Sequence, residues 1–225
     1  MCGWSHFFSA GFNPHLRLVY MLAELLRSGL SFFRHTVGII ISPYQTYRDI
    51  EKRGRTAEMV YIGLLVGLYF SLSSVVKIAS FHPLLLSRYA FVLFASALSG
   101  FGFIVSALVV TGRLLGRQTS VGRISLLWAY TLIPTVVWFL FTSLLYVAIP
   151  PPRTTQITGV LLSIVYLVVS AMIFWWKLTL SYLTLRFGLK IDFRKILIVA
   201  LAILPVLVLW TYAMYTLGVF KVPFL

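Results

Sequence analysis

The sequence predicts an all-α integral membrane protein, in which five transmembrane helices follow N-terminal amphipathic interfacial helices. Three observations support this prediction. The chain of 225 residues is 60% hydrophobic and only 11% charged, whereas soluble domains carry roughly a quarter charged residues. Its apolar residues fall in five long runs of spanning length. Basic residues gather beside alternate runs, which is typical of membrane proteins with a fixed orientation.

The net charge of +14 comes from 19 Lys and Arg against 5 Asp and Glu. These basic residues are scattered between apolar segments and form no continuous stripe, which argues against a nucleic-acid partner. Basic residues that flank spans set orientation and bind anionic headgroups. We therefore expect membrane lipids with anionic headgroups as partners, together with an unknown protein partner or a homo-oligomer, and no nucleic acid.

Residues 1–35 are expected to form an N-terminal tail and an amphipathic interfacial helix. Within residues 15–35, the charged and small polar side chains share one arc at helical spacing, and the rest of the surface is apolar. Such a helix lies in the membrane interface or packs its apolar face on its own bundle. It carries too many charges to cross the membrane.

A second, shorter helix is expected over residues 43–53, where Ser42 precedes a proline at the first helical position. Tyr44, Tyr47 and Arg48 lie on this helix and are candidate contacts for a partner protein. Packing of the tyrosine edge on the bundle is the alternative.

The five spans are expected at about residues 59–79, 89–112, 124–149, 157–177 and 196–217. Each has about 20 residues or more, which is enough to cross a hydrocarbon core of about 30 Å at 1.5 Å per residue. Gly63 and Gly67 in the first span have the small-xxx-small spacing that permits close helix contact.

Two prolines lie inside predicted spans, Pro134 in the third and Pro205 in the fifth. Proline lacks the backbone N–H and is expected to kink a helix. Tyr130 lies one turn before Pro134 and belongs to the same candidate bend. These bends are either hinges of a moving helix or static kinks that neighbouring groups stabilise.

The orientation follows from the basic residues, all but four of which fall on one side of the predicted spans. The four are Lys77, Arg88, Arg153 and Lys221. By the positive-inside rule, the N-terminus is cytoplasmic and the C-terminus is outside, in agreement with an odd number of spans. We expect a multi-pass protein of the cell inner (plasma) membrane.

The loop between the second and third spans carries Arg113, Arg117 and Arg123 among glycines and small polar residues. These arginines are candidate ligands for a phosphoinositide or another anionic headgroup. The alternative is that they only anchor the topology.

The chain offers little chemistry. Its acidic residues and histidines all lie outside the predicted spans, whereas proton-coupled transporters and intramembrane proteases need ionisable groups inside. Zinc-binding, phosphate-binding and nucleophile-elbow motifs are absent from the sequence. With Cys2 as its single cysteine, the chain cannot form an internal disulfide or a cysteine metal cluster. We expect no enzyme activity, no catalytic residue, no metal and no cofactor.

Three stretches resemble the Yip domain family, the Ypt/Rab-interacting type of five-span membrane protein. Pro43 with the following YQTYRDI resembles the opening of the domain. GRQTSVGRISLLWAYTLIP resembles the loop into the third span, where Tyr130, Thr131 and Pro134 occupy a Tyr-Ser/Thr-x-x-Pro element. WWKLTLSYLTLRFGLKIDFRKILIVALAILP resembles the passage from the fourth to the fifth span.

The resemblance covers about residues 33–220 and implies that residues 36–225 form a five-span Yip-like membrane domain. It implies a non-catalytic protein that organises membrane or partner proteins, related to trafficking or the cell envelope. The Asp-Leu-x-Gly-Pro element of the eukaryotic branch is absent, so the likeness is with a prokaryotic-like branch, and a GTPase partner stays open. A permease or transporter subunit is the alternative function.

Overall fold

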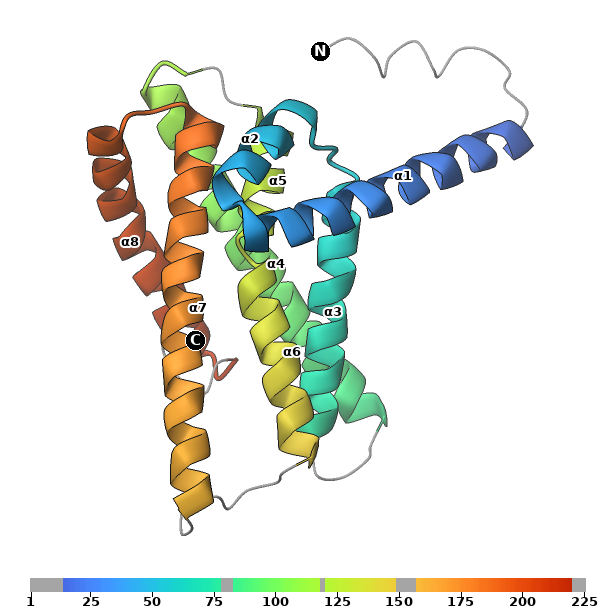
Figure 1. Ribbon diagram of the computed structural model, residues 1–225, viewed down its shortest axis with the longest axis vertical. Helices are drawn as coiled ribbons and strands as arrows, with labels where there is room; N and C mark the ends of the chain where they lie inside the picture. Colours follow the sequence, from blue (N-terminus) through green and yellow to red (C-terminus); the bar gives the residue numbers. More distant parts are fainter. Residues whose placement is uncertain (1–13, 78–82, 118–119, 149–156, 220–225) are drawn as a thin grey trace.

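A computed structural model describes residues 14–77, 83–117, 120–148 and 157–219 (Figure 1). Every regular element in these ranges is a helix, and five segments are long and apolar enough to cross a membrane. The predicted all-α, five-span architecture is therefore confirmed. In chain order the helices are α1 (Pro14–Ile41), α2 (Pro43–Arg53), α3 (Glu58–Lys77), α4 (Pro83–Leu114), α5 (Val121–Tyr130), α6 (Ile133–Ala148), α7 (Ile157–Leu189) and α8 (Phe193–Thr216).

The third span is broken, whereas the sequence predicted only a kink. The α5 helix ends at Tyr130, and α6 begins two residues before Thr135, so that Pro134 lies in its first turn. The break has a simple cause, because a proline at 134 cannot donate the backbone hydrogen bond that the carbonyl of Tyr130 would accept. Thr131 and Leu132 instead donate three residues back, to Trp128 and Ala129 respectively. Pro205 interrupts nothing, since α8 continues through it.

The helix of the fourth span continues past residue 177, as the mixed apolar and basic stretch after it allowed, and ends at Leu189. The α7 helix has 33 residues, about 50 Å at 1.5 Å per residue, whereas the hydrocarbon core is about 30 Å thick. The predicted span, residues 157–177, accounts for that thickness. The remaining residues, 178–189, carry the buried side chains Leu180, Leu183 and Leu189. The excess length of α7 therefore belongs to a packed region at one end of the molecule.

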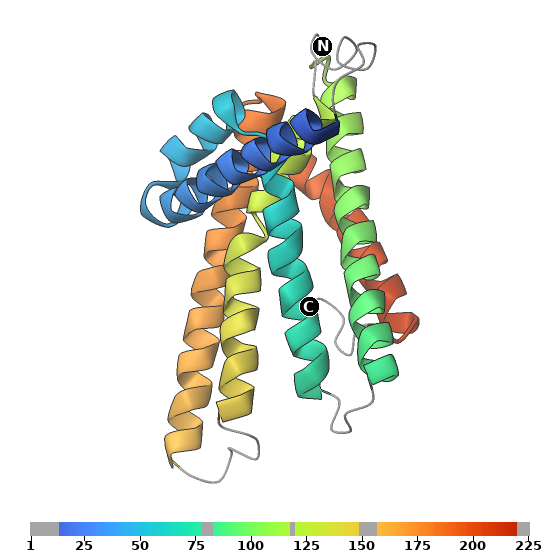
Figure 2. The same cartoon turned by 90° about the vertical axis from the view of Figure 1, so that its right-hand side faces the viewer.

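We call this region the head: the C-terminal part of α1, together with α2, α5 and residues 178–189 of α7. Figure 2 shows these elements gathered at one end, with α1 lying across the bundle. The parts of α3, α4, α6, α7 and α8 that extend away from the head are called the lower spans. The largest buried hydrophobic cluster lies in the head and includes residues from the starts of α3 and α6. It consists of Ile39, Tyr47, Ile50, Ile62, Leu126, Leu127, Ala129, Tyr130, Ile133, Leu180 and Leu183.

The connections before and after α2 are short. Ser42 precedes α2, but its side chain makes no capping hydrogen bond. At Gly54, immediately after α2, an added Cβ would lie 2.5 Å from the carbonyl oxygen of Ile50 and 2.7 Å from Cδ2 of Leu126. The absence of a side chain at Gly54 therefore lets α2 end directly against α5.

Between the lower spans, close helix contact through glycine occurs at Gly100 of the second span and not at Gly63 and Gly67 of the first. A Cβ at Gly63 would meet nothing within 4 Å, and one at Gly67 would only touch Phe94 at 3.9 Å. A Cβ at Gly100 of α4, in contrast, would lie 2.6 Å from the ring of Trp210 on α8. Gly100 is therefore the glycine that brings two lower spans together.

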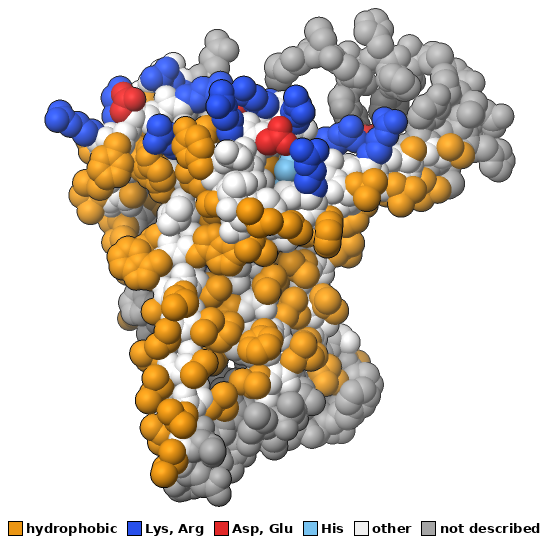
Figure 3. All heavy atoms as spheres, in the orientation of Figure 1, with side chains coloured by type: hydrophobic (Ala, Val, Ile, Leu, Met, Phe, Trp, Pro, Cys, Tyr) orange, Lys and Arg blue, Asp and Glu red, His pale blue; other side chains and the backbone are white. Residues whose placement is uncertain are grey.

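Charge separates along the long axis of the molecule. Figure 3 shows Lys and Arg side chains gathered over the head end of the displayed face, with hydrophobic side chains covering the part below. Along α1, the basic side chains lie on the edge that faces the head end and the hydrophobic ones on the opposite edge. The location of α1 in the membrane interface stays a prediction, and so does the division of the chain at residue 35, which falls inside α1.

Candidate functional site

Four ionisable residues from four helices meet inside the head. They are His35 of α1, Asp49 of α2, Glu58 of α3 and Tyr130 of α5, and we call this set the polar node. The side chain of Glu58 is completely buried and that of His35 is 7% exposed, while Asp49, at 34%, reaches the surface. Buried charged groups are rare unless they are paired, so this cluster is the strongest candidate for a functional site.

Glu58 accepts three hydrogen bonds. Tyr130 donates its hydroxyl to Oε2 at 2.5 Å, and Nδ1 of His35 lies 2.8 Å from the same oxygen. The backbone N–H of Arg55 donates to Oε1 at 3.1 Å. Both carboxylate oxygens are thereby satisfied by the protein, as a fully buried carboxylate requires.

His35 lies between two carboxylates. Its Nε2 is 3.6 Å from Oδ2 of Asp49, on the side opposite Glu58. The other oxygen of Asp49 lies 3.8 Å from Nε of Arg53. Glu58 is within hydrogen-bond distance of the imidazole, whereas Asp49 lies at ion-pair distance. His35 therefore links the buried carboxylate of Glu58 to the more exposed carboxylate of Asp49.

Local structure explains how these residues meet. Glu58 is the first residue of α3, where a carboxylate interacts favourably with the helix dipole and can bond back to the preceding turn, here to Arg55. Tyr130 is the last residue of α5, directly at the break of the third span. The aromatic rings of His35 and Tyr130 contact each other edge-on, with centroids 5.9 Å apart.

Glu58 was predicted to lie outside the spans, but it is the first residue of the first apolar spanning segment. His35 was placed only on the polar arc of the first helix. His35 and Glu58 are 23 residues apart and lie on different helices. Helical periodicity predicts which residues share a face of one helix, so it could not predict this contact. One signal was available, namely a lone carboxylate directly before an apolar run, because such a group needs a partner.

A second ionic contact involves one of the predicted loop arginines. Nη1 of Arg123 lies 3.5 Å from Oε1 of Glu51, and Nζ of Lys190 lies 3.3 Å from the same oxygen. This contact joins α2 to the start of α5 and to the α7–α8 turn. Arg113 and Arg117 are exposed, and the structure does not bring them to Glu51. Headgroup binding by the three arginines stays a prediction.

The predicted partner edge on α2 divides into two environments. Tyr47 is fully buried and donates its hydroxyl to the carbonyl of Leu127 at 3.4 Å. Burial raises the pKa of the Tyr47 phenol, and the hydrogen bond with Thr184 opposes this shift. Tyr44 and Arg48 are exposed, so only these two could meet a partner at this surface.

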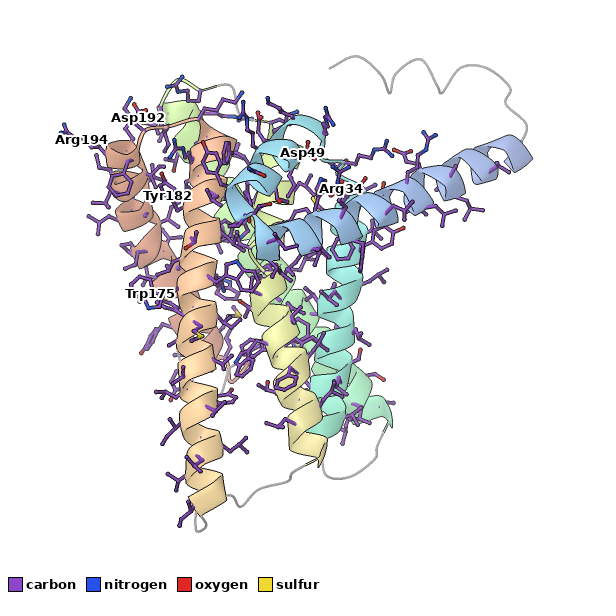
Figure 4. All side chains as sticks on the ribbon, viewed as in Figure 1. Arg34, Asp49, Trp175, Tyr182, Asp192 and Arg194 are labelled. Carbon is purple, nitrogen blue, oxygen red and sulfur yellow. The ribbon has the colours of Figure 1, made fainter. Side chains whose placement is uncertain are left out.

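Tyr44 also belongs to an exposed contact with α7. Its ring lies edge-on to Phe187 at 5.2 Å, and the guanidinium of Arg186 lies over it at 5.6 Å. Figure 4 shows Asp49 and Arg34 on the side of the head where α1 passes α2, and Asp192 with Arg194 at the α7–α8 turn. Within the described residues, no group of three or more His, Cys, Asp or Glu is placed to hold a metal ion.

These features define the class of protein, a multi-pass helical membrane protein with a packed, charged head at one end of its spans. The family follows from the sequence as a whole. The model of the Yip1 domain matches residues 37–214, from inside α1 to inside α8, and the chain belongs to this family. The predicted family is thereby confirmed. Among curated proteins and solved structures, no match is found.

Proposed function

We propose that this Yip1-domain protein is a non-catalytic organiser of partner proteins and lipids in the membrane. One observation supports this proposal above all, the apolar surface of α7 that the rest of the chain leaves uncovered. In the most apolar window of α7, 6% of the residues are buried, against 56% in the segment formed by α5 and α6. A span so little covered by its own chain presents its surface to lipid or to another protein.

The lipid part of this proposal concerns α1 and the arginine loop. The opposite edges of α1 carry basic and hydrophobic side chains (Figure 3), the distribution found in helices that lie flat in the interface. We propose that α1 rests in the headgroup layer and that Arg113, Arg117 and Arg123 contact anionic headgroups from the same side.

The proposed orientation places the head in the cytoplasm and the C-terminus outside the cell inner (plasma) membrane. The gathering of Lys and Arg at the head end supports it (Figure 3). No finding supports the alternative of a permease or transporter subunit.

Photo-crosslinking in intact cells tests the organising function. A photoreactive amino acid is placed at Leu167 of α7 or Leu201 of α8, which are 70% and 71% exposed. Leu64 of α3, at 64% exposure, serves as a matched control that is expected to capture lipid. We expect the same identified protein at α7 or α8 in repeated experiments. Recovery of the chain alone, with no reproducible protein or lipid, would contradict the proposal.

Cysteine labelling tests the orientation separately. In a Cys2→Ser background, Leu114→Cys at the exposed end of α4 is expected to resist an impermeant thiol reagent in intact cells. Val222→Cys, near the C-terminus, is expected to react. The reverse pattern would overturn the orientation without affecting the proposed function.

A further inference from the structure

The polar node connects α1 to the rest of the molecule. His35 lies six residues before the end of α1 (Pro14–Ile41), and its three ionisable partners belong to α2, α3 and α5. Apart from the contacts of His35, one hydrogen bond joins α1 to another long helix within the described residues. The hydroxyl of Tyr61 on α3 donates to the carbonyl of Leu25 at 2.6 Å, on an exposed surface. Ile39 and Phe32 pack α1 against the head cluster, and His35 adds its ionic contacts with the other helices.

Every element packed against His35 contributes to its electrostatic surroundings. The α2 helix presents Asp49, which is itself paired with Arg53. The α3 helix presents the buried carboxylate of Glu58, and α5 presents the hydroxyl of Tyr130 at 3.4 Å from Nδ1. On α1 itself the neighbouring charge is Arg34. Two carboxylates and one phenol thus contact the imidazole.

The two protonation states of His35 have different consequences. The imidazolium neutralises Glu58 and also forms an ion pair with Asp49, whose Oδ2 lies 3.6 Å from Nε2. The neutral imidazole leaves Glu58 buried without a counter-charge and turns a lone pair or a single N–H toward Asp49. An uncompensated buried charge is strongly unfavourable, and movement of α1 would relieve it by admitting water to the node.

We propose that His35, Asp49, Glu58 and Tyr130 form a proton-dependent latch, which fixes α1 across the head when His35 is protonated and releases it when His35 is neutral. Histidine is the side chain that ordinarily changes charge between pH 5 and 8. Histidines at interfaces serve as switches in other pH-sensing proteins. The latch does not depend on the proposed organising function, because it concerns only the position of α1.

The test measures the distance between two spin labels on the full chain in liposomes that contain anionic lipid. The labels are attached at Leu26→Cys on α1 and Val121→Cys at the start of α5, in a Cys2→Ser background. Both positions are exposed and lie outside the node. At pH 5.5 we expect one narrow distance distribution. At pH 8.5 we expect a second, broader one, with the ratio of fixed to released α1 about tenfold lower, within the range usual for coupled sites.

Two variants separate the latch from a general effect of pH. His35→Gln is expected to give the same distribution at both pH values, because glutamine does not titrate in this range. His15→Gln, which removes the other histidine of α1, is expected to keep the full response. Asp49→Asn is expected to move the midpoint to lower pH, since the imidazolium loses one of its two anionic partners.

The spin-labelled protein with an unsubstituted polar node can refute the proposal by itself, even if one of the variants fails to fold. Identical distance distributions at pH 5.5 and 8.5 in the labelled protein would overturn it. A pH response that persists in His35→Gln would overturn it as well, because the proton would then act elsewhere.

Discussion

Leu127 in the head is fully buried, whereas Leu167 on α7 is 70% exposed. The head packs helices from four regions of the sequence around aromatic and aliphatic side chains and a buried ionic cluster. In the lower spans α3 packs along α4 and α6, whereas α7 leaves a large apolar surface uncovered. The comparison suggests a division of roles, in which the head determines the shape of the molecule and the lower spans adapt to what surrounds them.

The largest effect is expected at Glu58. Glu58→Ala leaves His35 and Tyr130 without their acceptor, and breaking a buried pair typically costs about 3–5 kcal/mol. The measurement is the free energy of unfolding from SDS titration in mixed micelles. Glu24→Ala, on the exposed surface of α1, is the matched control and should stay within about 0.5 kcal/mol of the unsubstituted protein. Equal losses in the two variants would contradict the importance of the node.

The next prediction compares one substitution in the two regions. Leu127→Ala removes a buried side chain from the head and should destabilise the protein by about 2–5 kcal/mol. Leu167→Ala changes a side chain that faces outward from α7 and should alter stability by no more than about 0.5 kcal/mol. A large loss for Leu167→Ala in micelles would mean that a second copy of the chain covers α7.

A smaller effect is expected within the lower spans. Gly100→Ala forces the ring of Trp210 away from α4, and such overpacking costs about 1–3 kcal/mol. Gly63→Ala, where the added methyl group meets nothing within 4 Å, should be close to neutral. The free energies of unfolding of the two variants, measured under the same conditions, check this prediction. The opposite ranking would mean that α3, and not α4, makes the close helix contact.

The smallest effect concerns Tyr47. Its raised pKa means that folded Tyr47 keeps its proton when an unfolded tyrosine loses one near pH 10. Its contribution to stability is therefore complete below about pH 10 and falls as the pH rises further, by up to about 1.4 kcal/mol per unit. Tyr47→Phe should lose less stability than the unsubstituted protein between pH 9 and 11. Parallel losses would contradict the burial of this phenol.

The lower spans were easier to predict than the head, for physical reasons. The length of an apolar run is a local property, so the five spans could be located from the sequence. Pro134 predicted a departure from regular helix geometry. Whether the helix kinks or breaks there depends on the groups around the carbonyl of Tyr130, because Pro134 has no N–H to donate to it. The extension of α7 past Lys177 was only partly visible, because its continuation is mixed in polarity and is buried by other helices.

The site was the least predictable part, because its contacts join separate helices. Tyr130 and Glu58 are 72 residues apart, and a helical wheel considers one helix at a time. Gly63 and Gly100 look equivalent in sequence, yet only Gly100 has a tryptophan from another helix against it. Tyr44 and Tyr47 fall on the same edge of α2 in a helical wheel, but in the structure Tyr47 is buried and Tyr44 is exposed.

The separation between Glu58 and Tyr130 also bears on how the protein is made. A ribosome that adds 5–20 residues per second reaches Tyr130 roughly 4–14 s after Glu58. During this interval the first span enters the bilayer with its carboxylate still lacking the phenol. Closure of the head must therefore wait for the third segment to be delivered, which makes this tyrosine a late checkpoint in membrane insertion.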